Sequence, residues 1–214
     1  YRGRLGPGTG DLKSIRILNR VIQWCTDGIW YEADQRHVDL IVQDLGLDER
    51  SKPAPTPSVP TKVADEEPLP MDQSVVYRAL VARANYLAQD RVDIAYPVKE
   101  LCKQMARPRV HDWHQLKRLA GYLKGSARMV VKFQYQQRPE NLTVWTDTDH
   151  AGCLRTRKST SGGVLLLGTH LLKSWAPGLP APSQWRGREG ERCYNCRGQL
   201  HAEAKCWSQT YGRV

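Results

Sequence analysis

The stretch DWHQLKRLAGYLKGSARMVVKFQY, residues 112–135, contains the change of pattern that decides the fold class. Its first half carries apolar residues at the spacing of one helix face, and these are Trp113, Leu116, Ala120 and Leu123. Asp112 is suited to cap the start of this helix, and Gly125 is suited to end it. In the second half, apolar residues alternate along the chain as in a half-buried strand, and these are Met129, Val131, Phe133 and Tyr135. The stretch therefore predicts a helix followed by a strand.

The residues before this stretch continue the helical pattern. Two further helix faces are predicted, the first from Val76, Leu80, Ala84 and Leu87 and the second from Ile94, Val98, Leu101 and Met105. Residues 51–70 precede them and contain six prolines. Because proline removes a backbone donor and keeps the chain extended, this segment is predicted to be a linker rather than a packed element.

The N-terminal segment predicts a hairpin and a helix. Ile15 to Trp24 is rich in β-branched and apolar residues, Asp27-Gly28 is a tight-turn signal, and Ile29 to Ala33 would form the return strand. Asp34 would then cap a helix that ends at Gly46. The expected buried face of that helix consists of Val38, Ile41, Val42 and Leu45.

The residues after Tyr135 predict more strands. Leu142 to Thr146 forms one strand, which ends at Asp147. Gly163 to Leu167 and His170 to Trp175 predict a hairpin around Gly168-Thr169. Beyond Ala176 the composition changes to proline, glycine and arginine, which indicates a boundary. Helices followed by strands indicate an α+β fold.

The charge of the chain is uneven. The formal net charge is +10, and residues 77–138 contain thirteen Lys and Arg residues against four Asp and Glu residues. Such a block is typical either of a partner with a phosphate backbone or of a solvated basic surface, and the charge alone favours neither. No apolar run approaches the roughly 20 residues of a membrane span, and no signal peptide opens the chain. The expected location is intracellular, cytoplasmic or nuclear, and neither secretion nor a membrane partner is expected.

The last cysteines have the spacing of a metal site. Cys193, Cys196, His201 and Cys206 follow the pattern C-x2-C-x4-H-x4-C. Two thiolates two residues apart bind one side of a tetrahedral zinc ion, and a short loop returns a histidine and a third thiolate to the other side. A redox pair and a chance cluster are the alternatives, but no strand precedes Cys193 as a redox motif requires. The spacing predicts a zinc knuckle, with zinc as the cofactor.

Aromatic and basic residues surround these ligands. Tyr194 and Trp207 flank them where an aromatic face could stack on an unpaired base, although Trp207 could equally pack on the metal loop. Four arginines could contact phosphates, and these are Arg186, Arg188, Arg192 and Arg197. The expected partner is single-stranded RNA or DNA.

Several blocks of this sequence, in order, resemble the polyprotein of copia-type retrotransposons. They are Lys52-Pro53-Ala54-Pro55-Thr56-Pro57, Tyr77-Arg78-Ala79-Leu80, Tyr86-Leu87-Ala88, Asp93-Ile94-Ala95-Tyr96, Lys117-Arg118-Leu119, Tyr122-Leu123-Lys124-Gly125, Trp145-Thr146-Asp147-Thr148-Asp149-His150-Ala151-Gly152 and Arg157-Lys158-Ser159-Thr160-Ser161-Gly162-Gly163. The resemblance covers most of residues 1–175. The family's knuckle usually has glycines where Arg197 and Leu200 stand here.

The resemblance implies a division of the chain into segments with known counterparts. They are the end of a reverse transcriptase region (1–50), a proline-rich linker (51–73), connection helices (74–126), a truncated RNase H-like domain (127–176), a second linker (177–190) and the CCHC zinc knuckle (191–208).

The resemblance also implies what chemistry is missing. The aspartate pair of the family's polymerase is absent, and Asp147 matches the first catalytic carboxylate of the RNase H-like fold, where it would bind magnesium. The family has a Glu-Ala-Glu helix after the third strand. The most similar stretch here, residues 202–205, lies at a shifted position and has Lys205 in place of the second glutamate. Two-metal cleavage needs several carboxylates around ions about 4 Å apart. We therefore expect a nuclease remnant, and the alternative is an RNase H-type endonuclease that acts on an RNA–DNA hybrid with a divalent metal.

Overall fold

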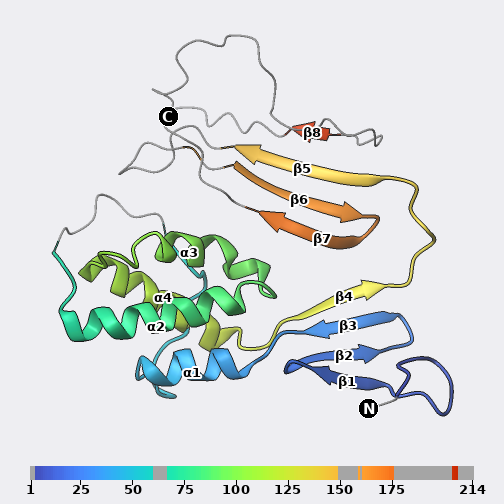
Figure 1. Cartoon of the computed structure of the whole chain (residues 1–214), viewed down its shortest axis with the longest axis horizontal. Coiled ribbons are helices and arrows are strands. Elements are labelled where there is room, and N and C mark those ends of the chain that lie inside the picture. The colour runs from blue at the N-terminus through green and yellow to red at the C-terminus, as the bar shows by residue number, and fades with distance from the viewer. Residues whose placement is uncertain (1–2, 60–66, 149–158, 160, 176–203, 207–214) are drawn as a thin grey trace, which may run out of the picture. The chain divides into compact units, whose positions relative to one another are not determined.

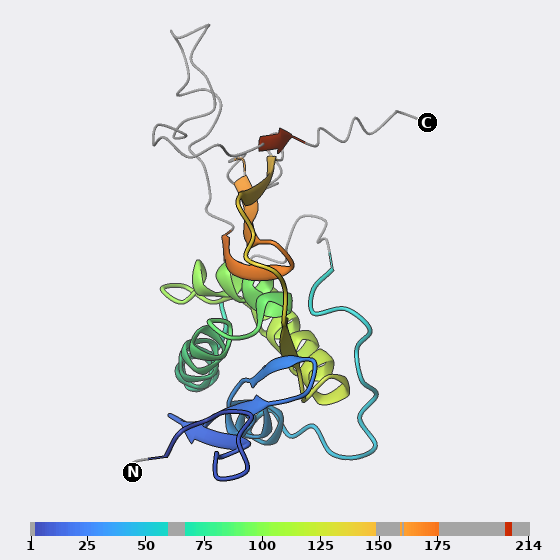
Figure 2. The ribbon, with the colours of Figure 1, turned by 90° about the vertical axis from the view of Figure 1, so that its right-hand side faces the viewer.

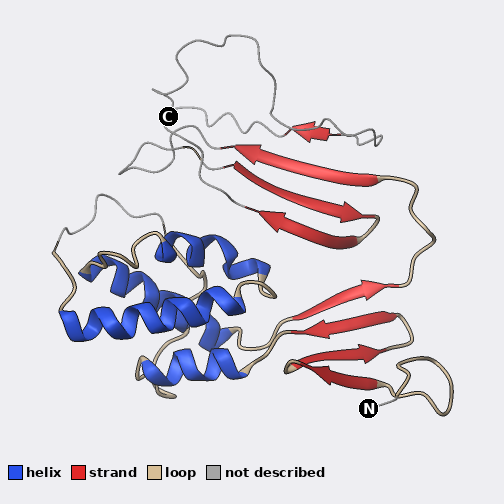
Figure 3. Cartoon of the chain, in the orientation of Figure 1, coloured by secondary structure: helices blue, strands red, loops and turns tan. Residues whose placement is uncertain are grey.

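The computed structural model describes residues 3–59, 67–148, 159, 161–175 and 204–206. The chain divides into two compact units, residues 1–135 and residues 136–214, and each unit has its own sheet (Figures 1 and 3). Both helices and antiparallel strands are present, so the α+β class is confirmed.

The first unit begins with an antiparallel sheet in the order β1-β2-β3-β4. The strands are β1 (Ser14–Ile17), β2 (Arg20–Trp24), β3 (Gly28–Glu32) and β4 (Val130–Gln134). The predicted hairpin around Asp27-Gly28 is present, because β2 pairs with β3. The prediction of one strand from Ile15 to Trp24 is wrong, because Leu18 and Asn19 form a tight turn with φ values of 50° and 63°. Two consecutive residues with positive φ suit a two-residue hairpin, but leucine is not a turn signal and concealed it.

Strand β4 lies in the first sheet and not with the later strands. Phe133 pairs with Ile29 and Val131 pairs with Tyr31, so the strand adds to the free edge of β3. The unit boundary follows Tyr135, whereas the resemblance had placed residues 127–135 in the RNase H-like segment. The alternating pattern revealed the strand but could not reveal its partner, since any edge with a complementary face accepts it.

Four helices complete the first unit and pack side by side (Figures 1 and 2). They are α1 (Arg36–Asp44), α2 (Met71–Leu87), α3 (Val92–Cys102) and α4 (Val110–Gly125). Their shared core consists of fully buried apolar side chains, which include Ile41, Tyr77, Leu80, Ile94, Val98, Leu116, Leu119 and Leu123. All four predicted helices are thus present. Val76 was expected in the core but is 39% exposed, because α2 buries the face that carries Tyr77 and Val81 instead.

The ends of α1 differ in how well the sequence predicted them. Gly46 follows the helix with a φ of 66°, a conformation that glycine adopts without strain. The cap at the start is Gln35 rather than Asp34. The Asp34 carboxylate instead accepts hydrogen bonds from the backbone and the guanidinium of Arg36, at 3.1 and 2.8 Å.

The described parts of the proline-rich segment, although mostly exposed, contact the first unit at several points. The Ala54 N–H donates to the carbonyl oxygen of Gly121 at 3.1 Å, and Lys124 donates to the carbonyl oxygen of Ser51 at 2.7 Å. At the other end, Leu69 is only 7% exposed and belongs to the core. The Ala54 N–H of the segment and the Lys124 amine of α4 are the donors here, so the missing proline donors do not prevent these contacts.

The second unit contains a sheet in the order β7-β6-β5-β8. Its strands are β5 (Leu142–Thr148), β6 (Ser161–Leu167), β7 (His170–Trp175) and β8 (Ala204–Cys206). The first three are antiparallel, and β8 runs parallel to β5. The predicted hairpin around Gly168-Thr169 is confirmed, and Gln136 holds its turn through hydrogen bonds to Leu167 and Thr169. Within the described part of the chain, no helix has the length and apolar character to cross a membrane.

Candidate functional site

Asp147 is the penultimate residue of β5, at the strand end that the sequence predicted. Its neighbour across the sheet is Gly162 of β6, and its own side chain is exposed. Among the residues that the structure describes, no three His, Cys, Asp or Glu side chains gather where they could hold a metal ion. The described part of the second unit therefore presents Asp147 as a single carboxylate at a strand end, without the partners that phosphodiester cleavage requires.

The predicted zinc ligands lie almost entirely outside the described residues. Cys193, Cys196 and His201 are outside them, and so are the flanking Tyr194 and Trp207. The same holds for the arginines of the tail, which are Arg186, Arg188, Arg192 and Arg197. Only the backbone of Cys206 is described, as the last residue of β8, where it pairs with Thr146. The knuckle therefore stays a prediction from the ligand spacing.

The basic block of residues 77–138 is largely engaged inside the first unit. Some of its residues form ion pairs with Asp or Glu, and these are Arg91, Lys99, Lys103 and Arg128. Others donate to carbonyl or hydroxyl oxygens, and these are Arg78, Arg118 and Lys124. Lys117 and Lys132 lie over the rings of Trp113 and Trp30, at 5.7 and 4.3 Å from the ring centroids. Nine of the thirteen basic residues of the block thus contact other groups of the protein.

Arg91 is the most deeply placed member of that block, with 1% of its surface exposed. Its guanidinium donates to both carboxylate oxygens of Asp93, at 2.9 and 2.7 Å, and to the carbonyl oxygen of Ala127. The Tyr122 hydroxyl donates to the same carboxylate at 2.9 Å. Burial opposes ionisation of Asp93, but the hydrogen bonds and charge of Arg91 hold its pKa below the ordinary value. The pair fastens the start of α3 to the end of α4.

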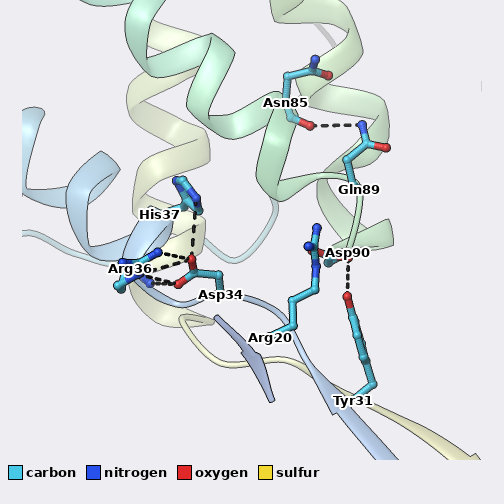
Figure 4. A network of polar contacts seen from close by, with 8 residues as sticks. All are labelled: Arg20, Tyr31, Asp34, Arg36, His37, Asn85, Gln89 and Asp90. Atoms are coloured by element: carbon cyan, nitrogen blue, oxygen red, sulfur yellow. Dashed lines mark hydrogen bonds and ion pairs between the residues drawn. The ribbon is translucent and has the colours of Figure 1, made fainter. Parts of the chain in front are cut away.

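A second polar cluster joins the first sheet to the turn between α2 and α3 (Figure 4). Arg20 of β2 and Tyr31 of β3 both donate to the Asp90 carboxylate, at 2.7 and 2.6 Å. Burial and the hydrogen bond to Asp90 raise the pKa of Tyr31 to about 12. The Arg20 guanidinium also lies 5.4 Å from the centroid of the Tyr86 ring. Because the tyrosine stays protonated at neutral pH, this cluster acts as a joint between sheet and helices.

The start of α1 adds a third set of contacts, also drawn in Figure 4. Hydrogen bonds from the Arg36 guanidinium lower the pKa of Asp34, which is 6% exposed. The His37 ring lies 3.8 Å from the Asp34 carboxylate through Nε2 and packs against the Tyr86 ring at 4.8 Å between centroids. Sequence reasoning missed these clusters. Their local signals are the Asp90-Arg91-x-Asp93 run between two predicted helices and the Asp34-x-Arg36-His37 run at the start of α1.

Comparison with known proteins relates the chain to retrotransposon sequences. It is 31% identical over 149 residues to the uncharacterized mitochondrial protein AtMg00810 of Arabidopsis thaliana, an alignment that covers 67% of this chain and 59% of that protein. It is 31% and 32% identical over 127 residues to the retrovirus-related Pol polyproteins from the Arabidopsis transposons RE2 and RE1. Those two alignments cover 59% of this chain but only 9% and 8% of the polyproteins.

These similarities agree with the resemblance seen in the sequence blocks, and the homologues include Pol polyproteins of retrotransposons. No protein-family model matches the chain. No solved structure matches it either. The chain spans less than two thirds of the length of each of these relatives.

Proposed function

We propose that the chain is a nucleic-acid-binding and zinc-binding fragment of a copia-type retrotransposon Pol polyprotein, without nuclease activity of its own. The observation that carries the zinc proposal is the spacing of Cys193, Cys196, His201 and Cys206, which suits one tetrahedral ion. The similarity to two Pol polyproteins supports a role in handling nucleic acid.

The pairing of the basic block affects where nucleic acid would bind. Since Arg91 and Arg128 form ion pairs with acidic residues, the first unit offers fewer unpaired cations than its composition suggests. The arginines around the knuckle, together with Tyr194 and Trp207, are therefore the main proposed contacts for single-stranded RNA or DNA.

The zinc site is tested by metal analysis of the purified full chain. We expect about one zinc ion per chain, and Cys196→Ser should abolish binding because three protein ligands do not close a structural site. Cys25→Ser is the matched control, since Cys25 is a free cysteine at the end of β2 and far from the knuckle in sequence. Equal zinc content in the two variants would refute the site.

Nucleic-acid binding is tested by titrating a labelled single-stranded oligonucleotide at several salt concentrations. Affinity should fall steeply with salt, because each neutralised phosphate releases a counterion. Trp207→Ala should weaken binding by about 1–3 kcal/mol if the ring stacks on a base. Affinity that does not respond to salt would exclude a phosphate-backbone partner.

The second candidate function is an RNase H-type endonuclease, which the position of Asp147 at a strand end favours. The family's Glu-Ala-Glu pattern is incomplete in this sequence, with Lys205 in place of the second glutamate, and this ranks the enzyme below the binding function. With magnesium or manganese present, an RNA–DNA hybrid should stay intact. Cleavage that is lost in Asp147→Asn would establish the enzyme instead.

A further inference from the structure

A pocket of about 400 Å³ lies at the start of α2, beside the loop that joins α3 to α4. Among the nine described residues that line it, three are arginines, namely Arg78, Arg107 and Arg109, and none is acidic. The remaining wall is mostly apolar or proline, which includes Pro68, Leu69 and Pro108. A concave site lined by several arginines suits an anion better than a cation or an apolar ligand.

Backbone hydrogen bonds hold the two walls of this pocket together. The Leu69 N–H donates to the carbonyl oxygen of Pro108 at 3.0 Å, and the Val110 N–H donates to the carbonyl oxygen of Glu67 at 3.1 Å. Leu69 is also anchored in the core, with 7% of its surface exposed. The pocket is therefore formed before any ligand arrives, which lowers the entropy cost of binding.

Arg78 is positioned by the fold. Its Nε donates to the carbonyl oxygen of Met105 at 2.8 Å, which orients the guanidinium at the pocket wall. No contact within the described residues occupies its two terminal amino groups. Arg107 lines the same pocket with an exposed side chain. A planar guanidinium with two adjacent donors matches two oxygens of a phosphate.

The start of α2 adds donors on the same side. The helix begins at Met71 after Pro70, with no side-chain cap, so the N–H groups of its first turn have no partner within the helix. Those groups carry partial positive charge. Glu67 and Asp72 are near in sequence but do not line the pocket, and the Asp112 carboxylate accepts from the Arg109 backbone N–H at 2.9 Å.

We propose that this pocket binds a phosphate group of a nucleic-acid backbone and gives the chain a second contact, separate from the knuckle. The inference rests on the proposed nucleic-acid binding and adds a defined anchor point in the first unit. A backbone phosphate is chosen over a free one because the pocket is lined on one side by apolar residues and is open to the surface through the exposed Met71 and Arg107.

The test measures oligonucleotide affinity of the full chain against salt for Arg107→Gln and for Arg16→Gln. Arg16 is an exposed arginine of β1, so its variant loses the same charge away from the pocket. Removing one phosphate contact to a single strand should weaken binding about fivefold at 0.1 M salt and reduce the salt slope by about 0.7. The loss should be the same for oligonucleotides of different sequence. Arg16→Gln should bind as the unchanged chain does.

The other outcomes separate the pocket assignment from the proposed nucleic-acid binding. If both variants bind as tightly as the unchanged chain, the pocket assignment is wrong while the proposed function stands. If the unchanged chain binds no oligonucleotide, both fail. A titration with inorganic phosphate alone, followed by NMR at the amides of residues 71–73, tests whether the pocket binds free phosphate instead of a backbone phosphate. Shifts that Arg107→Gln removes, with unchanged oligonucleotide affinity, would identify a free-phosphate site and overturn the backbone assignment.

Discussion

The helices of the first unit and the strands of the second differ in what holds them together. All the fully buried apolar side chains that the structure describes lie between Ala33 and Leu123. Strands β5 to β7 have no buried residue among those whose burial is described, and Trp145 and Leu172 are 38% and 51% exposed. Both regions are rich in apolar residues, so composition does not explain the difference.

The difference follows from the geometry of the elements. Four helices enclose a core on several sides, whereas a single sheet needs a second layer to bury either of its faces. The backbone pairing of β5, β6 and β7 is regular apart from one irregularity between Leu165 and Leu166. Hydrogen bonds in a sheet contribute little net stability unless side-chain burial accompanies them. The described sheet is therefore well paired but poorly buried.

The largest expected effect comes from separating the two regions. A fragment of residues 1–135 should fold alone with one cooperative thermal transition, since its core lies entirely within it. A fragment of residues 136–175 should stay unfolded, because none of its strand residues whose burial is described is buried, and strands without a buried apolar face are marginal. Circular dichroism and NMR dispersion of the two fragments provide the measurement. A folded 136–175 fragment would contradict the expected difference in stability between the two units.

A smaller effect is expected from shortening one leucine in each region. Leu116→Ala should lower the free energy of unfolding of the first unit by about 2–5 kcal/mol, because the side chain is fully buried. Leu165→Ala in β6 should cost less than about 1 kcal/mol, since its site is only half-buried. Urea denaturation measures both. Leu172→Ala, at an exposed site of β7, is the control with almost no expected change.

A third prediction concerns the buried ion pair between Arg91 and Asp93 in the first unit. Asp93→Asn should lower the free energy of unfolding by about 2 kcal/mol at neutral pH, because Arg91 then keeps its charge without its partner. The folded-state pKa of Asp93 is lowered, so its contribution is present above the ordinary pKa of about 3.9 and is lost as the pH falls through the lower folded value.

The same variant gives a pH test. Unfolding of the unchanged chain and of Asp93→Asn should differ most near neutral pH, and the gap should narrow in acid. A gap of constant size from pH 7 to pH 3 would show that the carboxylate charge does not provide the stabilisation.

Local patterns were sufficient to identify most elements. The four helices followed from apolar spacing, and Gly46 and Gly168 mark ends and turns because their positive φ is a property of the residue itself. The position of Asp147 at the end of β5 also followed from the sequence. The Leu18-Asn19 turn did not, because leucine rarely adopts positive φ and only the pairing of β1 with β2 imposes it.

The sequence by itself determined the elements and the spacing of the proposed zinc ligands, since both are set by residues close together along the chain. The tertiary structure alone decided that β4 joins the first sheet and that Arg91 of the basic block is buried in an ion pair with Asp93. Tyr31 and Asp90 illustrate the reason. They are 59 positions apart, and their hydrogen bond exists only because the core brings the sheet to the turn between α2 and α3. Such pairings depend on how elements pack, and no short stretch of sequence encodes that.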